Sequence, residues 1–338
     1  MNPAAAQDIL RRTIPAGLPL LLVGAPGVGK TAIVKKVADE LDYRLVISHP
    51  VTADPTDFRG LPWMVDGHAC FLPIGDLARL AQLEGHRGIW LIDDLGQALG
   101  ATQASVMQLV HQDGRALNGF KLPDGVAVVA CSNRAQDRAG VGAFLAPLVG
   151  RFTTVLTVEP EAVSFVNWAI RLGGFNPLVA SFILWQPQYL LDQDRPEHSL
   201  QQVCSPRTWE HVSQLLDLGF ASTQLIELIG GAITPAVATE FLAYLQVYNS
   251  LPNADLVRAD PDNAPLPTAP DATYATAVHL ATAAKPADFG LFCRYVARLE
   301  PEFQLLFMLI AIAKQPPLRH TAEYIAWATH PDNVAILE

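Results

Sequence analysis

Residues 18–31 read LPLLLVGAPGVGKT, a continuous apolar run that ends in a glycine-rich turn. The run Leu18–Val23 contains no charged or hydrogen-bonding side chain, which is typical of a strand buried on both faces of a parallel sheet. The period then changes, because apolar residues from Val34 to Leu41 recur at helical spacing. The stretch therefore predicts a strand, a glycine turn and a helix from about Thr31 to Leu41, in that order.

The glycine turn matches the pattern GxxxxGK[ST], and the strand before it and the helix after it are the setting in which that pattern binds phosphate. Glycines let backbone N–H groups line a concavity, and the helix start adds a positive dipole. Lys30 is placed to reach the β and γ phosphates of ATP, and the Thr31 hydroxyl to bind Mg²⁺. We therefore predict a nucleotide site formed by Gly24, Ala25, Pro26, Gly27, Val28, Gly29, Lys30 and Thr31.

Two further apolar runs lead into polar residues. Gly88–Ile92 is followed by Asp93 and Asp94, and Val126–Cys131 is followed, after one serine, by Asn133. A carboxylate at the carboxyl end of a strand can hold hydrated Mg²⁺, the role predicted for Asp93, while Asp94 can polarise the attacking water. Asn133 carries both a donor and an acceptor and is predicted to orient that water.

The wider pattern predicts an α/β fold. Further buried strands are expected at Leu45–Ser48 and Thr153–Val158, and helices at stretches such as Ala101–Val110, which implies a parallel sheet with helices on both faces. Beyond Pro160 helical spacing dominates. We expect an α/β nucleotide-binding domain over 1–160, an α-helical domain over 161–250, a proline-rich linker or surface loop over 251–275, and a C-terminal helical segment over 276–338.

Two β-prone insertions interrupt the first domain. Arg115–Leu122 contains Asn118 and Gly119 between short arms, a strong signal for a two-residue hairpin. The other insertion surrounds Trp63–Leu72, where aromatic side chains suit either a grip on another protein or ordinary packing. We favour packing for its aromatic residues.

Composition restricts the function classes. Half of the 338 residues are hydrophobic, enough for the cores of two or three domains, and the formal charge of −10 disfavours nucleic acid as a partner. The four cysteines lack the spacing of a disulfide framework or zinc site. No signal peptide is recognised, and the apolar stretch Leu305–Ala313 is shorter than the roughly 20 residues that span a bilayer. We expect a cytoplasmic protein without a membrane span.

The order of these motifs, continued by Gly150-Arg151-Phe152 and by Ser205-Pro206-Arg207-Thr208-Trp209, resembles the AAA+ ATPases over about residues 15–245. The Asn-Gly hairpin, the stretch from Asn133 to Val141 and the Ser205–Trp209 segment are similar to the MoxR-type branch in particular. The resemblance implies a phosphate-loop ATPase domain followed by a helical lid. It leaves the role of residues 250–338 open.

The resemblance also implies roles for single residues. Asn133 is similar to sensor 1, Arg151 to the arginine finger that enters a neighbouring subunit's site, and Arg207 to sensor 2 on the lid. Arg134 and Arg138 remain rivals of Arg151 for the interface role. The Arg115–Leu122 hairpin resembles an insertion that contacts other parts of the ring or its client, with a simple connecting hairpin as the alternative. The family usually has Asp-Glu where this chain has Asp93-Asp94, which bears on the rate of hydrolysis.

Three functions follow as hypotheses. The first is a Mg²⁺-dependent ATPase ring, expected to be a hexamer, that remodels a protein client or inserts a cofactor as a chaperone, with a separate partner carrying a von Willebrand factor A-like domain. The second is a slow ATP-dependent scaffold, in which Asp94 turns over too weakly for mechanical work. The third, a nucleic-acid motor, is disfavoured by the acidic charge. Catalytic roles are assigned to Asp94, Asn133, Arg151 and Arg207, and metal binding to Thr31 and Asp93.

Overall fold

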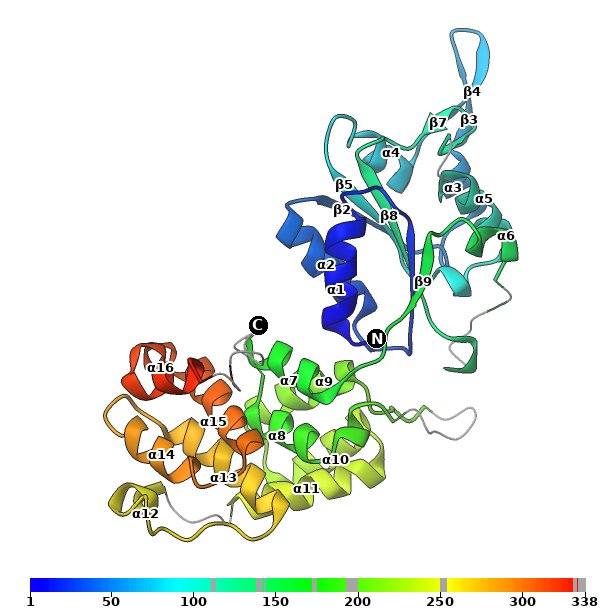
Figure 1. The fold of residues 1–338 in the computed structure, drawn as a ribbon. Helices are drawn as coiled ribbons and strands as arrows, with labels where there is room; N and C mark the ends of the chain where they lie inside the picture. The colour runs from blue at the N-terminus through cyan, green and yellow to red at the C-terminus, as the bar shows by residue number, and fades with distance from the viewer. Residues whose placement is uncertain are drawn as a thin grey trace. The chain divides into compact units, whose positions relative to one another are not determined.

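The computed structural model describes residues 1–110, 114–137, 142, 144–171, 175–192, 200–249, 254–330 and 333. The chain divides into two compact units, Met1–Pro160 and Glu161–Glu338 (Figure 1). Unit 1 contains every strand of the three sheets, and unit 2 is helical in its described residues.

Unit 1 is built on a parallel sheet of five strands in the order β2-β5-β8-β1-β9. These strands are β1 (Leu20–Val23), β2 (Arg44–Ser48), β5 (Gly88–Ile92), β8 (Val126–Ser132) and β9 (Thr154–Thr157). Every residue of β5 and β8 is buried, as their uninterrupted apolar sequences predict for central strands. The predicted α/β fold with a parallel sheet is confirmed.

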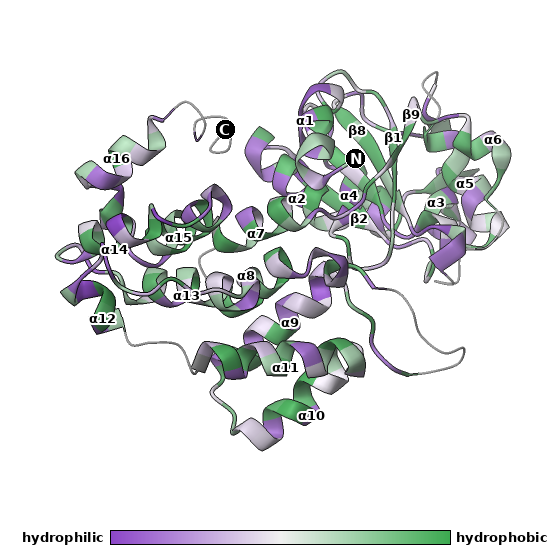
Figure 2. Cartoon of the chain, turned by 60° about the horizontal axis from the view of Figure 1, so that its bottom comes forward, coloured by the Kyte–Doolittle hydropathy of each residue, from purple (hydrophilic) through white to green (hydrophobic). Residues whose placement is uncertain are grey.

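Helices cover both faces of this sheet. They are α1 (Pro3–Thr13), α2 (Lys30–Leu41), α3 (Pro55–Arg59), α4 (Gly75–Ala81), α5 (Gly100–Val110) and α6 (Ala146–Val149), with short 3-10 turns at Leu95–Gln97 and Ala135–Asp137. Alternate residues of β5 lie in different hydrophobic cores, one on each face of the sheet. Trp90 packs with α3, α4 and α5, whereas Ile89 and Leu91 pack with α1 and α2. The central strand β8 is accordingly coloured as hydrophobic in Figure 2.

Two antiparallel hairpins interrupt unit 1. One is β6 (Ala116–Leu117) with β7 (Phe120–Lys121), and its turn residues Asn118 and Gly119 both have positive φ. This is the backbone conformation that a two-residue hairpin turn requires. The hairpin predicted at Arg115–Leu122 is therefore confirmed.

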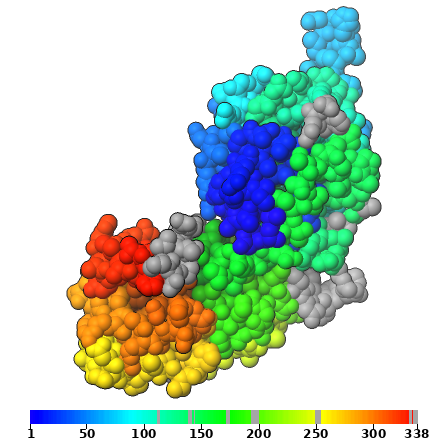
Figure 3. Space-filling model, viewed as in Figure 1, coloured from blue at the N-terminus to red at the C-terminus, as the bar shows by residue number. Residues whose placement is uncertain are grey.

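The other hairpin, β3 (Leu61–Val65) with β4 (His68–Leu72), projects from the rest of unit 1 (Figures 1 and 3). Trp63 is 60% exposed and Phe71 is 42% exposed. The interpretation of these aromatic residues as packing residues was therefore wrong. A sheet of two strands with no layer over it leaves its side chains in solvent, and the apolar composition alone did not reveal that.

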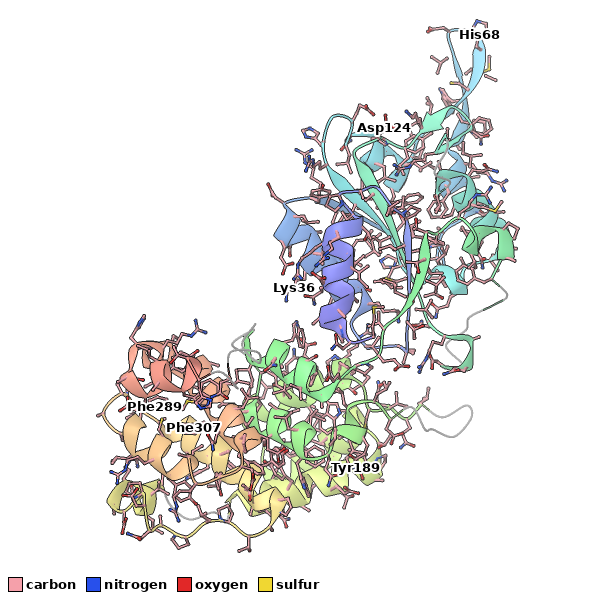
Figure 4. The ribbon with its side chains drawn as sticks, viewed as in Figure 1. Lys36, His68, Asp124, Tyr189, Phe289 and Phe307 are labelled. Atoms are coloured by element: carbon pink, nitrogen blue, oxygen red, sulfur yellow. The ribbon has the colours of Figure 1, made fainter. Side chains whose placement is uncertain are left out.

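Unit 2 contains ten α-helices in its described residues. They are α7 (Ala162–Arg171), α8 (Pro177–Trp185), α9 (Pro206–Asp217), α10 (Ser222–Ala232), α11 (Pro235–Asn249), α12 (Ala254–Ala259), α13 (Pro270–Ala283), α14 (Phe289–Val296), α15 (Pro301–Lys314) and α16 (Ala322–Ala328), with 3-10 turns at Pro187–Leu190 and Pro316–His320. One hydrophobic core runs from Phe165 to Leu318, and it includes the stacked pair Phe289 and Phe307 (Figure 4). The helices after residue 254 thus share a core with the helices of the predicted lid.

The segment 251–275, predicted as a linker or surface loop, differs from that expectation. It contains α12, and α13 begins at Pro270 and packs against α8, α11 and α15. Ala254 and Val257 are buried one helical turn apart. Prolines that suggested extended chain are also well placed at the first position of a helix, where the missing N–H costs no hydrogen bond. In the described part of the chain, no helix combines the length and apolarity needed to cross a membrane.

The four free cysteines provide a test of this arrangement. Burial raises the pKa of Cys131 and Cys204 and raises the pKa of Cys293 to about 12, whereas Cys70 lies on the projecting β4 strand. Thiolate is the reactive form, so at about pH 8 we expect a thiol reagent to label Cys70 fastest. Timed labelling with peptide mass spectrometry measures this. Cys70→Ser should remove the fast phase, and fast labelling of Cys131 in the native protein would contradict the fold.

Candidate nucleotide site

The predicted site residues lie at one edge of the parallel sheet. Val23 of β1 pairs with Ser132 of β8, and Ile92 of β5 pairs with Ala130. These three strands therefore end side by side. The glycine turn follows β1, the two aspartates follow β5, and Asn133 follows β8. This edge is where ligands bind in open parallel α/β sheets.

The glycine turn is shaped by backbone conformations that suit glycine. Gly27 has φ 79° and Gly29, the residue before α2, has φ 95°. Gly24 is required for a different reason, since a Cβ atom there would lie 2.6 Å from the carbonyl oxygen of Val158. The turn thus packs directly against the backbone of the chain that follows β9.

Lys30 is the first residue of α2 and is 7% exposed. Its Nζ donates to the carbonyl oxygens of Gly24 at 2.9 Å and Ala25 at 3.0 Å, and to Asn133 Oδ1 at 2.9 Å. Burial lowers the pKa of Lys30, and the nearby Asp93 and Asp94 oppose that shift. A buried ammonium group surrounded by oxygen acceptors is suited to bind an anion that enters the turn.

The two predicted metal ligands are in contact. Thr31 Oγ1 donates to Asp93 Oδ2 at 2.7 Å, and Asp93 is 8% exposed. Hydroxyl and carboxylate oxygens are the donors that Mg²⁺ prefers, and these two lie beside the turn that would hold the phosphates. The residues present therefore fit a Mg²⁺ ion bound together with a nucleotide.

Asn133 joins the two halves of the site. Its Oδ1 accepts from Lys30, and its Nδ2 donates to Asp94 Oδ1 at 3.2 Å. Asp94 itself has φ 55°, a conformation that directs the chain sharply away after β5. The structure thus links Lys30, the predicted phosphate ligand, to Asp94, the candidate base, through one amide, a link that residue spacing did not predict.

Sequence reasoning also missed Ser48. Its carbonyl oxygen accepts from the backbone N–H of Asp93 at 2.9 Å, and its hydroxyl accepts from Trp90 Nε1 at 2.9 Å. Ser48 ends β2, the strand next to β5. The signal available in the sequence was a polar residue at the end of a predicted strand. Its bonds to Trp90 and Asp93 hold the end of β5 against β2.

Arg151 and Arg134 differ in their surroundings. One terminal nitrogen of Arg151 donates to the Pro147 carbonyl at 3.1 Å, but its Nε is buried without a hydrogen-bond partner, and no ion pair to Arg151 is found among the described residues. Arg134 is instead paired with Asp137 at 2.8 Å, a contact that raises its pKa. Arg134 is thus less available to a second subunit than Arg151. Arg138, the other rival, lies outside the described residues.

Arg207 lies in unit 2, in the first turn of α9. The neighbouring residues have structural roles: Ser205 caps the helix, Thr208 completes the capping box, and Trp209 is buried with its Nε1 bonded to the Tyr189 carbonyl at 2.7 Å. Arg207 is exposed, and no partner for it is recorded within the described residues. Unlike its neighbours, Arg207 has no visible role in capping or packing this helix.

Comparison with known families decides the class of the first unit. Residues 20–160 match the model of the ATPase family associated with various cellular activities, AAA. This match spans the glycine turn, both aspartates, Asn133 and Arg151. The chain carries an AAA ATPase domain. No curated protein matches it.

Solved structures similar to this chain share little sequence with it. A RuvB mutant of Thermotoga maritima is 15% identical, with 72% of this chain and 68% of that chain covered and a TM-score of 0.43. A putative ATPase of Cytophaga hutchinsonii is 19% identical, with 46% of each chain covered and a TM-score of 0.32. NtrX of Brucella abortus, solved with ADP, is 14% identical over 99% of this chain and 68% of that chain, with a TM-score of 0.37.

Substitution of Gly24 tests the glycine turn. In Gly24→Ala the new methyl group meets the Val158 carbonyl, so the backbone of the turn must shift and ATP affinity should fall by about tenfold or more. Titration with a fluorescent ATP analogue measures the change. Gly100→Ala is the matched control, because nothing lies within 4 Å of a Cβ atom at that position. Equal affinities in the two variants would contradict the proposed role of Gly24.

Proposed function

We propose that this AAA ATPase assembles into a ring, a hexamer, and uses Mg²⁺-dependent ATP hydrolysis to remodel a protein client, as a chaperone or in cofactor insertion. A separate partner protein with a von Willebrand factor A-like domain would present the client, as in the MoxR-type branch that the sequence resembles. The observation that carries the proposal is the hydrogen-bonded group of Lys30, Thr31, Asp93, Asp94 and Asn133 at the sheet edge.

Binding of ATP begins at the glycine turn. Phosphate oxygens compete for the N–H groups of Lys30, which donate to Gly24, Ala25 and Asn133. Backbone N–H groups of the turn and the start of α2 stabilise the same negative charge. Thr31 and Asp93 would hold Mg²⁺, which when bound neutralises charge that develops on the phosphates.

Hydrolysis then requires an attacking water in a fixed position. Asn133 orients it, and Asp94 accepts its proton as the water oxygen bonds to the γ phosphorus and the bond to the ADP leaving oxygen breaks. Because Asn133 Oδ1 accepts from Lys30, loss of that bond on phosphate binding frees the amide for the water. The same amide that senses the nucleotide therefore serves the reaction.

Assembly is supported by Arg151. Among the described residues Arg151 forms no ion pair and its Nε has no hydrogen-bond partner, and a γ phosphate in a neighbouring subunit would supply the missing opposite charge to its terminal nitrogens. Arg207 would report the nucleotide state to the helical unit. Hydrolysis would then depend on protein concentration, because each site needs a residue from a second chain.

Mixing of two inactive variants tests this arrangement. Arg151→Ala should bind ATP normally but lose about 10³-fold in hydrolysis, and Lys30→Ala should lose ATP binding. In a mixture, a Lys30→Ala subunit supplies Arg151 to the intact site of an Arg151→Ala neighbour, so part of the ATPase activity should return. Steady-state phosphate release measures it, with Arg79→Ala as an exposed arginine control. A mixture that stays inactive would refute action between subunits.

A second candidate function is a slow ATP-dependent scaffold. The observation that favours it is Asp94, whose carboxylate lies one methylene closer to the backbone than a glutamate would place it. In a scaffold, bound ATP holds an assembly together and turnover is incidental. In a remodelling machine, turnover is the source of work.

Substitutions of Asp94 separate these two functions. Asp94→Asn removes the base but keeps the shape, so ATP binding and assembly should persist while hydrolysis falls by about 10²-fold or more. Asp94→Glu should hydrolyse ATP at least as fast as the wild type. The rate of ATP hydrolysis is measured for the wild type and each variant, alone and with candidate partner proteins. Wild-type turnover that no partner raises, with client activity unchanged in Asp94→Asn, would favour the scaffold.

The nucleic-acid motor receives no support from the basic residues of the β6–β7 hairpin. Arg115 donates to the carbonyl of Val126 and burial lowers its pKa, and Lys121 pairs with Asp124 at 3.0 Å. Both cations thus have partners within unit 1. A nucleic-acid channel needs several cations that remain available to phosphates.

A further inference from the structure

A groove of about 510 Å³ lies where the two hairpins of unit 1 meet α5. Its lining includes Arg59 at the end of α3, Pro62 and Phe71 of the β3–β4 hairpin, Ser105 of α5, and Leu117 and Asn118 of the β6–β7 hairpin. We call it the hairpin groove. None of these residues belongs to the nucleotide site.

The groove is held in shape by contacts between the hairpins. Asn118 Nδ2 donates to the Arg59 carbonyl at 3.1 Å, which ties the turn of one hairpin to the base of the other. At that base Gly60 has φ 80°, and a Cβ atom there would lie 2.8 Å from the Leu72 carbonyl. The two strands of the β3–β4 hairpin therefore meet at its base in a close backbone contact that only glycine allows.

The groove contains one cation, Arg59, which acts on the Asp54 carboxylate only at longer range and forms no close ion pair among the described residues. Arg59 is exposed, and its Nε donates to Ser105 Oγ at 2.8 Å, which fixes the side chain on α5. Among the described residues no carboxylate forms an ion pair with Arg59. The other N–H groups of its guanidinium suit a carboxylate, which binds such a group through two parallel hydrogen bonds.

The apolar wall continues along the projecting hairpin. Pro62 pairs with Phe71 and Met64 pairs with Ala69, so these four side chains share one face of the two-stranded sheet. Met64 is 61% exposed. His68, labelled in Figure 4, lies near the tip at which this face ends. Each strand also has one edge without a neighbour in its sheet, which an extended chain can pair with.

We propose that the hairpin groove binds an extended segment of a client polypeptide that carries apolar side chains and a carboxylate. The apolar side chains would lie on Phe71, Met64 and Leu117, and the carboxylate on Arg59. A phosphate backbone is a poorer match, because it needs several cations and the groove lining has one. This inference specifies which kind of client the proposed remodelling ATPase binds. It depends on the proposed function only where peptide binding is coupled to ATP hydrolysis.

An array of short synthetic peptides that tile unrelated unfolded proteins tests the groove, with the labelled full-length protein as the probe. Bound peptides should be enriched in apolar residues together with Asp or Glu. Phe71→Ser should weaken binding by about tenfold, the loss expected for one apolar side chain. Arg59→Gln should remove the preference for acidic residues and keep that for apolar ones. Leu99→Ser changes an exposed apolar residue of unit 1 outside the groove; it is the control and should bind as the wild type does.

Unchanged binding in both groove variants would overturn the proposal, as would a preference for basic peptides, binding of single-stranded DNA alone, or self-association that accounts for the signal. Thermal unfolding confirms that each variant is folded. ATP hydrolysis is measured in parallel and should keep its basal rate in both variants. A wild-type protein that binds the peptides without hydrolysing ATP would refute the proposed function and leave the groove assignment intact.

Discussion

The buried charge of Lys30 is the constraint on which the nucleotide site depends. An ammonium group removed from water must be surrounded by acceptors, and here two carbonyls of the glycine turn and the Asn133 amide provide them. Those acceptors come from the ends of β1 and β8, so the site exists only when the strands are in register. The positions of Asp93 and Asp94 follow from the same register, because β5 pairs with β8.

Sequence alone predicted most of unit 1 because its signals are local. An apolar strand, a glycine turn and a helix fix the positions of Lys30 and Thr31, and the rule that parallel strands end at one edge brings Asp93 and Asn133 to them. The bond between Asn133 and Lys30 was beyond such reasoning. It depends on side-chain orientation across two loops, for which spacing carries no information.

Two predictions made from the sequence were wrong, and both failed for the same kind of physical reason. The prolines between residues 252 and 270 suggested extended chain, yet Pro270 begins α13 and the segment contributes Ala254 and Val257 to the core. Trp63 and Phe71 were assigned to packing because aromatic residues are usually buried, whereas a hairpin with no covering layer exposes them. In both cases tertiary surroundings, which a single sequence does not display, decided the outcome.

The contact between Gly24 and the Val158 carbonyl has a mechanical consequence. Val158 N also donates to the Val23 carbonyl at 2.8 Å, so the chain that leaves β9 is hydrogen-bonded to the residue just before the glycine turn and lies close against the first glycine of that turn. Three residues after Val158 that chain passes into the helical unit. Any load that the helical unit places on its covalent connection would therefore reach the start of the glycine turn first, and tension there would alter the shape of the candidate nucleotide site.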